Sequence, residues 1–369
     1  MIRIYNWLGQ NIDGQLEAAL KKQADTWEPI YFPANDKAYI LNEFHTTESS
    51  AVRLVGEGPH TSRIVMGSSR AGILVDQRQA DYKGWSCNIQ DLGIDVLPDI
   101  ELDAPALSVY GQGTENKMAS HCQIHNVQFG PADKRSPPQG GEKRKRPTPT
   151  WLALSGTIGM QVTNCNFTGH WYYGGAVAGI RFTSNAGVIE DIEGSSHVAR
   201  SMKCTIKNNC QFFVMMTAIL VDPDAWIEGL RITGNQMVDV GTGVLVLSDG
   251  THGGGTLIDV IDNHIAFRQT GIVIEQGVAD IRGNYLLPLP HWEYEEDSAH
   301  VVLGAPYNTE PIKAQLSRVA FNNFGMVDLK NLPEVAVLIY PPSRKIRVHD
   351  NFVQGGIPEV LDKSIKEPA

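Results

Sequence analysis

A short pattern of apolar and polar positions recurs along most of the chain. Each copy has an apolar residue, two polar or turn-forming residues, often Asn, and a second apolar residue. The nine copies begin at Ile89, Ile124, Val162, Ile206, Ile232, Val260, Ile281, Val319 and Val348. The shortest interval, from Val260 to Ile281, fits one coil of three short strands, and longer intervals add inserted loops. The pattern therefore predicts a repeat architecture.

A second short strand alternates with the first. It has a small residue followed by apolar, variable and apolar positions, as in AILV from Ala218 and GIVI from Gly271. The copies begin at Ala71, Ala106, Trp151, Ala178, Ala218, Gly243, Gly271, His300 and Ala336. Two such strands cannot bury an apolar face alone, so neighbouring copies must stack. We expect an all-β solenoid of about ten coils built from parallel sheets.

One turn position is Asn in the six later copies. These residues are Asn209, Asn235, Asn263, Asn284, Asn322 and Asn351. A short amide side chain tolerates unusual backbone angles and bonds turn groups, so the stacked copies predict a structural Asn ladder. Two positions before each copy, strand alternation predicts an inward side chain, which places Cys87, Cys122 and Cys204 in the core.

The segment before the repeats predicts a cap. Asp13–Ala24 has Leu16, Ala19 and Leu20 at helical spacing, and IYFPANDKAYIL from Ile30 and VRLVGEGPHTSRIVM from Val52 supply the first extended segments. An open solenoid end needs a cover, so we expect this helix to cap it. We expect three parts: residues 1–50 with the cap helix and first strands, residues 51–355 as the solenoid, and residues 356–369 as a tail.

This succession of cap helix, extended segments and Asn-turn coils resembles the right-handed parallel β-helix superfamily, the pectate-lyase-like proteins that include bacteriophage tailspikes. The resemblance covers about residues 10 to 355. It implies a parallel β-helix and a polysaccharide ligand, which members mostly bind, cleave or epimerise. For a tailspike-like member it also implies a homotrimer. These motifs belong to the scaffold, so they are specific for the fold and weak for the reaction.

The middle residue of each second strand points away from the core. These residues are Leu74, Ser108, Ala153, Arg181, Leu220, Leu245, Val273, Val302 and Leu338. Because most of them are apolar, they predict a continuous outward stripe, which would serve as a partner surface. We expect a homotrimer through this stripe, and the alternative is that the chain's own loops cover it.

The loops after the second strand carry the candidate catalytic acids. Asp222 and Glu275 each directly follow the last inward residue of their strand, two coils apart, and Asp224 and Asp249 lie on the intervening loops. Adjacent coils lie about 4.8 Å apart, so carboxylates one or two coils apart are separated by about 5 to 10 Å. That range includes the spacings of retaining and inverting glycosidases. The alternative is that each acid merely solvates a strand end.

Aromatic and basic residues on the same loops are candidate substrate-binding groups. Aromatic rings suit the faces of sugars, and His or Arg complements an anionic sugar. The candidates are Trp226, His197, Arg200, His252, Trp292 and Tyr294. We expect no cofactor, and the alternative of a calcium ion would use Asp222, Asp224 and Asp249.

Composition and charge narrow the function classes. The 41 acidic and 31 basic residues give a net charge of -10, which disfavours a nucleic-acid or anionic-membrane partner. No apolar run approaches the roughly 18 residues of a membrane span, and the start lacks the plan of a signal peptide. The five cysteines lack metal-type spacing. No GxxxxGK[ST], GxSxG or HExxH motif is present, so nucleotide hydrolysis, α/β-hydrolase chemistry and zinc proteolysis lack support.

The sequence and the resemblance together favour a phage-derived spike, or receptor-binding, protein that binds a bacterial surface polysaccharide. Its candidate catalytic acids would depolymerise that glycan if the protein is a glycoside hydrolase or polysaccharide lyase. We expect such a protein in the virion after assembly in the host cytoplasm, with another virion protein contacting its N-terminal segment. Two alternatives remain: a bacterial polysaccharide lyase or epimerase, secreted by a route that the chain does not encode, and a non-catalytic structural or adhesive β-helix.

Overall fold

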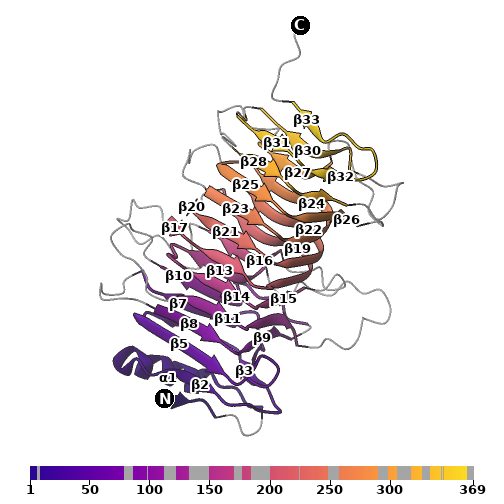
Figure 1. Ribbon diagram of the computed structural model, residues 1–369. Coiled ribbons are helices and arrows are strands. Elements are labelled where there is room, and N and C mark those ends of the chain that lie inside the picture. Colours follow the sequence, from indigo (N-terminus) through magenta and orange to yellow (C-terminus); the bar gives the residue numbers. More distant parts are fainter. Residues whose placement is uncertain are drawn as a thin grey trace, which may run out of the picture.

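Short parallel strands wind in successive coils along one axis, with the N-terminal helix near one end and the last strand, β33 (Val360–Asp362), near the other (Figure 1). The computed structural model describes residues 1–5, 9–78, 86–97, 99–111, 122–132, 149–169, 177–183, 200–223, 225–247, 257–289, 298–305, 317–325, 333–341, 343 and 345–363. Within these residues, no helix has the length and apolarity needed to cross a membrane.

The predicted cap helix is confirmed as α1 (Asp13–Thr26). It buries Leu16, Ala19 and Leu20 against the first coils and ends at Trp27, whose left-handed backbone and N–H bond to the Gln23 carbonyl close the last turn. The buried Asp13 carboxylate accepts hydrogen bonds from the N–H groups of Asn42 and Glu43 and lies 2.9 Å from Nε2 of His45.

Opposing effects act on this carboxylate. Burial alone would raise the pKa of Asp13, but the hydrogen bond with His45 and the backbone donors together lower it. Asp13 is therefore held as a charged group that fastens the start of α1 to strand β4 (Phe44–Thr47).

All nine predicted copies of the first strand lie in one parallel sheet of 12 strands, the first sheet. Its strands are β1 (Ile2–Arg3), β2 (Ile30–Phe32), β5 (Ala51–Gly56), β8 (Ser86–Gln90), β11 (Gln123–His125), β14 (Gln161–Thr163), β18 (Thr205–Lys207), β21 (Leu230–Thr233), β23 (Leu257–Ile261), β25 (Val278–Arg282), β28 (Arg318–Ala320) and β31 (Arg347–His349). Equivalent residues of successive copies pair directly, as Ile232 with Val260 and Val260 with Ile281.

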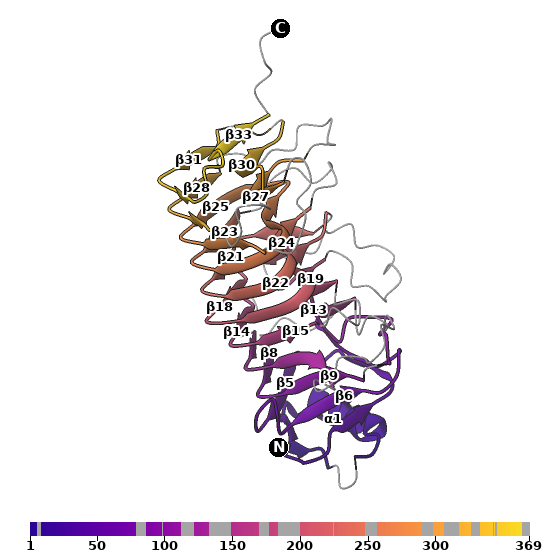
Figure 2. The same ribbon diagram turned by 90° about the vertical axis from the view of Figure 1, so that its right-hand side faces the viewer.

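The other strands form two parallel stacks that β19, β22 and β24 join, because each of these continues from one stack into the other (Figure 2). The second stack holds all nine predicted second strands, which are β7 (Gly72–Asp76), β10 (Leu107–Tyr110), β13 (Thr150–Ser155), β16 (Ala178–Phe182), the ends of β19 (Gln211–Val221), β22 (Gln236–Val246) and β24 (His264–Ile274), β27 (Ala299–Leu303) and β30 (Val335–Ile339). It also includes β4 at one end and β33 (Val360–Asp362) at the other. The third stack holds β3 (Tyr39–Leu41), β6 (Arg63–Met66), β9 (Gly93–Val96), β12 (Gln128–Pro131), β15 (Asn166–Thr168), the starts of β19, β22 and β24, β26 (Tyr285–Pro288), β29 (Asn323–Phe324) and β32 (Phe352–Val353). A separate pair is β17 (Arg200–Met202) with β20 (Trp226–Glu228).

Side chains of equivalent positions stack along the solenoid interior. The rings of Phe129, Phe167 and Phe212 lie nearly parallel, with successive centroids 4.8 and 4.9 Å apart. The expected inward cysteines are confirmed, since all five cysteines are free and buried. Burial raises the pKa of Cys122 to about 12 and that of Cys204 to about 11, so these thiols are protonated core groups.

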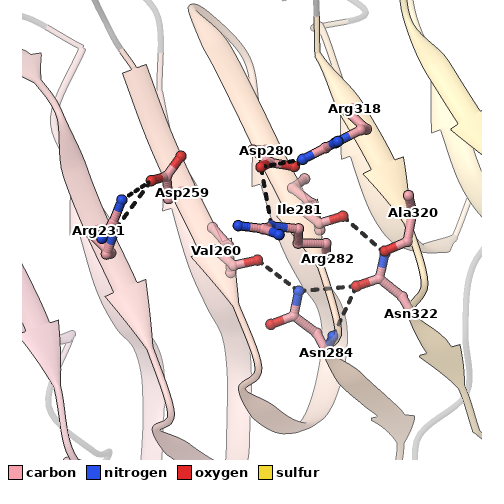
Figure 3. Close-up of polar contacts among 10 residues, drawn as sticks. All are labelled: Arg231, Asp259, Val260, Asp280, Ile281, Arg282, Asn284, Arg318, Ala320 and Asn322. Carbon is pink, nitrogen blue, oxygen red and sulfur yellow. Dashed lines mark hydrogen bonds and ion pairs between the residues drawn. The ribbon is translucent and has the colours of Figure 1, made fainter.

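The predicted Asn ladder is confirmed for five of its six members. In each step, Oδ1 of one Asn accepts hydrogen bonds from the backbone N–H and Nδ2 of the preceding one, as Asn322 does from Asn284 at 3.0 Å (Figure 3). The rungs are Asn235, Asn263, Asn284, Asn322 and Asn351.

The prediction for Asn209 was wrong. Its turn contains one extra residue, so that Asn208 and Asn209 both adopt left-handed backbone angles, with φ of 59° and 62°. Cys210 then occupies the slot, and its N–H donates to Oδ1 of Asn235 at 3.2 Å. Asn209 itself is exposed at the turn.

At the start of each strand of the second stack, the small residue that precedes the apolar, variable and apolar positions faces the third stack. A Cβ at Gly179 would lie 2.7 Å from Phe212, and one at Gly271 would lie 2.5 Å from Leu286. His300 fills the same slot in its coil and is fully buried. Its ring contacts Phe267 and Phe324 edge to face, with centroids 5.5 and 5.2 Å apart.

The burial of His300 makes stability depend on pH. Burial lowers its pKa from 6.5 to about 4, so the unfolded chain binds a proton in this interval that the folded chain does not. We expect the contribution of neutral His300 to the free energy of unfolding to be complete above pH 6.5. It should fall by up to about 3 kcal/mol as the pH decreases to 4. Urea unfolding at pH 7.5 and 4.5 measures it.

A substitution isolates the contribution of this histidine. Ala336 occupies the equivalent position of the next coil, so His300→Ala should fold, with lower stability at pH 7.5 and a smaller loss between the two pH values. The matched control is His60→Ala, at an exposed position, which should leave the pH difference unchanged. An undiminished pH difference in His300→Ala contradicts the assignment.

Candidate functional site

The outer face of the second stack carries the predicted stripe. The residues pair in unbroken register from Leu74 through Arg181 and Leu245 to Leu338. The expectation that the whole stripe is exposed was wrong, because Leu74 and Leu338 are buried and Leu220 is 8% exposed.

The chain itself covers both ends of this stripe. Leu74 packs with Tyr110 and Phe44, and Leu338 packs with Ala299 and Val335. Strand residues of the same chain therefore cover both ends, and the alternative of coverage by the chain's loops stays untested, because most of these loops lie outside the described residues. The adjacent residues Leu245 and Val273 remain half-buried in the middle.

A mostly polar row, the edge row, follows the stripe at the carboxyl ends of the strands, and Leu247 interrupts it. Its members are Asp76, Tyr110, Ser155, Thr183, Asp222, Leu247 and Glu275. Register pairs the first three, and backbone hydrogen bonds continue it, with Asp222 N–H donating to Phe182 and Glu275 N–H donating to Val246. Asp222 and Glu275 thus lie at one edge, two coils or about 10 Å apart along the backbone.

An ion pair holds Asp222 in place. Nε of Arg181 lies 2.9 and 2.8 Å from its two carboxylate oxygens. Asp222 is 5% exposed, whereas the Arg181 side chain is 41% exposed. A cation at this distance favours the ionised carboxylate, so Asp222 is suited to act as a charged group rather than as a proton donor.

The strand pattern predicts that Arg181 points outward, but it does not reveal Arg181 as the partner of Asp222. The available signal was the register: Arg181 is level with Leu220 of the next coil, and Asp222 lies two residues beyond on the same outward face. A long guanidinium side chain reaches across one strand spacing to such a diagonal neighbour.

A second charged cluster lies at the start of the edge row and was also missed. Arg78 holds the Asp76 carboxylate through two hydrogen bonds of 2.8 and 2.7 Å. Its guanidinium lies 5.6 Å from the centre of the Tyr110 ring. Burial raises the pKa of Tyr110, so its hydroxyl stays neutral and can donate a hydrogen bond.

A buried amide connects the two acidic coils. Gln276, which follows Glu275, is 3% exposed, and its Nε2 lies 3.5 Å from the carbonyl oxygen of Pro223, which follows Asp222. Its Oε1 has no hydrogen-bond partner among the described residues. The turn after Glu275 therefore contacts the turn after Asp222 across the intervening coil.

Most of the other predicted site residues lie outside the described residues. These are Asp224, Asp249, His197, His252, Trp292 and Tyr294. Arg200 and Trp226 are paired directly in the parallel strands β17 and β20, so their backbones lie side by side. The described residues contain no group of three or more His, Cys, Asp or Glu side chains that could hold a metal ion. The calcium alternative stays untested, because Asp224 and Asp249 are not among them.

Comparisons with known proteins identify the fold. No protein-family model and no curated protein sequence matches the chain. A mutant tailspike protein of E. coli bacteriophage HK620 has a similar structure, with a TM-score of 0.55 at 12% sequence identity over 98% of this chain and 63% of the tailspike chain. The chain is a right-handed parallel β-helix. This confirms the predicted fold class and its resemblance to tailspike structures.

Two further structures share this fold at lower similarity. A mutant of the same tailspike in complex with a pentasaccharide has a TM-score of 0.48 at 11% identity, over 97% of this β-helix and 62% of that chain. The surface protein and adhesin PfbA of Streptococcus pneumoniae has a TM-score of 0.44 at 11% identity, over 97% of each chain. This β-helix spans less than two thirds of the tailspike length, and at these identities the likeness concerns the fold alone.

Proposed function

We propose that this β-helix is a spike-like receptor-binding protein that binds a bacterial surface polysaccharide along the edge row. The observation that carries the proposal is the run of polar side chains from Asp76 to Asp222, with Glu275 beyond Leu247, at equivalent positions along one edge of the second stack. Asp76, Tyr110 and Asp222 are held by buried contacts or ion pairs, so the row is rigid before a ligand arrives. A straight, regularly spaced row suits an extended polymer, and preorganisation lowers the entropic cost of binding it.

Cleavage of the bound glycan would use Asp222 and Glu275. Asp222 would act as the ionised base and Glu275 as the proton donor, with a water between them. The two-coil separation favours inversion, because retaining enzymes place their carboxyl groups only about 5 to 5.5 Å apart.

A second candidate function is adhesion without cleavage. One observation favours it: Arg181 already engages both oxygens of the buried Asp222 carboxylate. In this case the ion pair would serve as a fixed polar contact for the glycan, as surface ion pairs in rigid scaffolds can.

Incubation with a panel of bacterial capsules and O-antigens separates these functions. Depolymerisation would yield products whose masses show added water for a hydrolase, or absorbance near 235 nm for a lyase. Binding without products supports adhesion. Failure to bind any glycan of a broad panel would contradict the proposed function, and loss of binding in Arg181→Glu would assign the contact to the edge row.

A homotrimer, as part of a virion, is the assembly that we propose. Leu245 and Val273 are adjacent in register and half-buried, and burying the rest of each side chain is worth about 1 kcal/mol, a part of what full burial from water gives. The double variant Leu245→Glu/Val273→Glu should therefore sediment as a monomer. Leu97→Glu, at an exposed leucine on another surface, should leave the assembly unchanged. A monomeric wild-type chain contradicts the trimer.

A further inference from the structure

A pocket of about 650 Å³ opens on the first sheet, where β23, β25, β28 and β31 begin. It lies on a different sheet from the edge row. Its apolar wall includes Leu257, which is 48% exposed, and the half-buried residues Val278 and Ile346. A volume of this size accommodates a small ligand such as one or two sugar rings.

Two small buried residues border the pocket on its inner side. Ala279 and Ser317 occupy the inward position that Ile258 and Ile346 fill in the flanking coils. Ser317 Oγ accepts a hydrogen bond from the Ala279 N–H at 3.0 Å, so these two strand starts are also tied together.

Beside this pocket, outward charges of the first sheet form ion pairs between neighbouring strands. Arg231 bonds Asp259 in the adjacent strand, and Arg318 bonds both oxygens of Asp280 at 2.9 and 2.7 Å (Figure 3). The next residue in this column is Arg347, which is directly in register with Arg318. Like charges at adjacent positions destabilise a sheet, so a second arginine here is unfavourable without an anion.

The pocket therefore carries an excess of positive charge. Arg318, Lys345 and Arg347 line it, against one acid, Asp280. Within the described part of the chain, the side chains of Lys345 and Arg347 have no hydrogen bond or ion pair, and both are exposed. This excess stands out in a chain whose net charge is -10.

We propose that this pocket binds the carboxylate of an acidic sugar, with the apolar face of the sugar ring on Leu257 and Val278. Lys345 and Arg347 would bind the carboxylate, because an ammonium and a guanidinium form charge-assisted hydrogen bonds with it. An acidic sugar matches the pocket because it joins an anionic group to a ring with an apolar face. The proposal rests on the proposed function only in taking a saccharide as the ligand.

Saturation-transfer NMR of the full chain tests this proposal by measuring the binding of glucuronate, galacturonate and N-acetylneuraminate. Glucose serves as the uncharged control and citrate as a carboxylate without a sugar ring. We expect saturable binding of at least one acidic sugar, with the strongest transfer to ring protons on one face, and no comparable binding of glucose. Binding of citrate as tight as that of the sugars, or binding of none of the three acidic sugars, overturns the proposal.

Variants assign the binding to the pocket. The double variant Lys345→Glu/Arg347→Glu should weaken the acidic sugar at least tenfold, and Leu257→Ser should weaken it less and reduce the transfer to the ring. The matched control is Arg53→Glu, an exposed arginine in the same outward column at the other end of the first sheet. Equal binding by the wild type and the double variant overturns the proposal.

The outcome is separable from that of the proposed function. If acidic sugars bind at this pocket but the chain binds no capsule or O-antigen, the pocket proposal stands and the proposed function is contradicted. If Arg181→Glu abolishes polysaccharide binding but no acidic sugar binds to Lys345 and Arg347, the proposed function stands and the pocket proposal is contradicted.

Discussion

Glu275→Gln should lower turnover of a cleaved polysaccharide by at least about a hundredfold while leaving its binding nearly intact. The amide keeps the size of the side chain and its place at the edge of the second stack, but it cannot donate the proton that the leaving oxygen needs. Asp222→Asn should produce a loss of similar size for a different reason, since the amide cannot act as the ionised base and lacks the charge that pairs with Arg181. Product formation by mass spectrometry measures both losses.

A double-mutant cycle distinguishes the two roles that Asp222 can have. If Asp222 only positions Arg181, then Arg181→Met and the double variant Arg181→Met/Asp222→Asn should be equally impaired. If Asp222 acts on the substrate, the double variant should be clearly worse than Arg181→Met. Full activity in all four amide variants, at Asp222, Asp224, Asp249 and Glu275, would move the site elsewhere on the chain.

The stereochemistry of the product provides an independent check. The separation of two coils favours inversion of the anomeric carbon, because a water must fit between the sugar and the base. NMR spectra of freshly formed product would show the anomer directly. Retention would contradict the pairing of Asp222 with Glu275, even if each residue alone were essential.

The fold could be predicted because each coil repeats the same local physics. Apolar residues such as Ile232, Val260 and Ile281 stack at one position, so the pattern of one coil also predicts the register of the next. The cap helix could be predicted from Leu16 and Leu20 for another local reason. An amphipathic helix before an open solenoid end has one apolar surface to cover.

The candidate site was less predictable because it depends on contacts between coils. The order of the residues placed Asp222 at a strand end, but its bond to Arg181 depends on a diagonal offset between strands. The exposure of the stripe depends on which other segments cover it, and no local pattern predicts that Leu338 is buried by Val335 and Ala299. The pocket near Arg347 likewise combines residues of four strands that are far apart in the sequence.

Asn284→Ala should destabilise the β-helix by about 4 kcal/mol, because its amide makes four hydrogen bonds inside the turn. Nδ2 donates to the Val260 carbonyl at 2.8 Å and to Oδ1 of Asn322 at 3.0 Å, and Oδ1 accepts from the N–H and Nδ2 of Asn263. Asn284 is 1% exposed, so water cannot replace these partners without opening the turn. Urea unfolding followed by circular dichroism measures the loss.

The matched control is the asparagine that the sequence pattern wrongly placed in the ladder. Asn209 is exposed and left-handed, with φ of 62°, so Asn209→Gly keeps a backbone that glycine readily adopts and should change stability by less than about 0.5 kcal/mol. Equal losses in Asn284→Ala and Asn209→Gly would mean that turn composition, rather than the hydrogen-bonded ladder, stabilises the coils. A large loss at Asn284 alone would show that the backbone slot decides the role of an asparagine, since Cys210 occupies that slot where the turn is one residue longer.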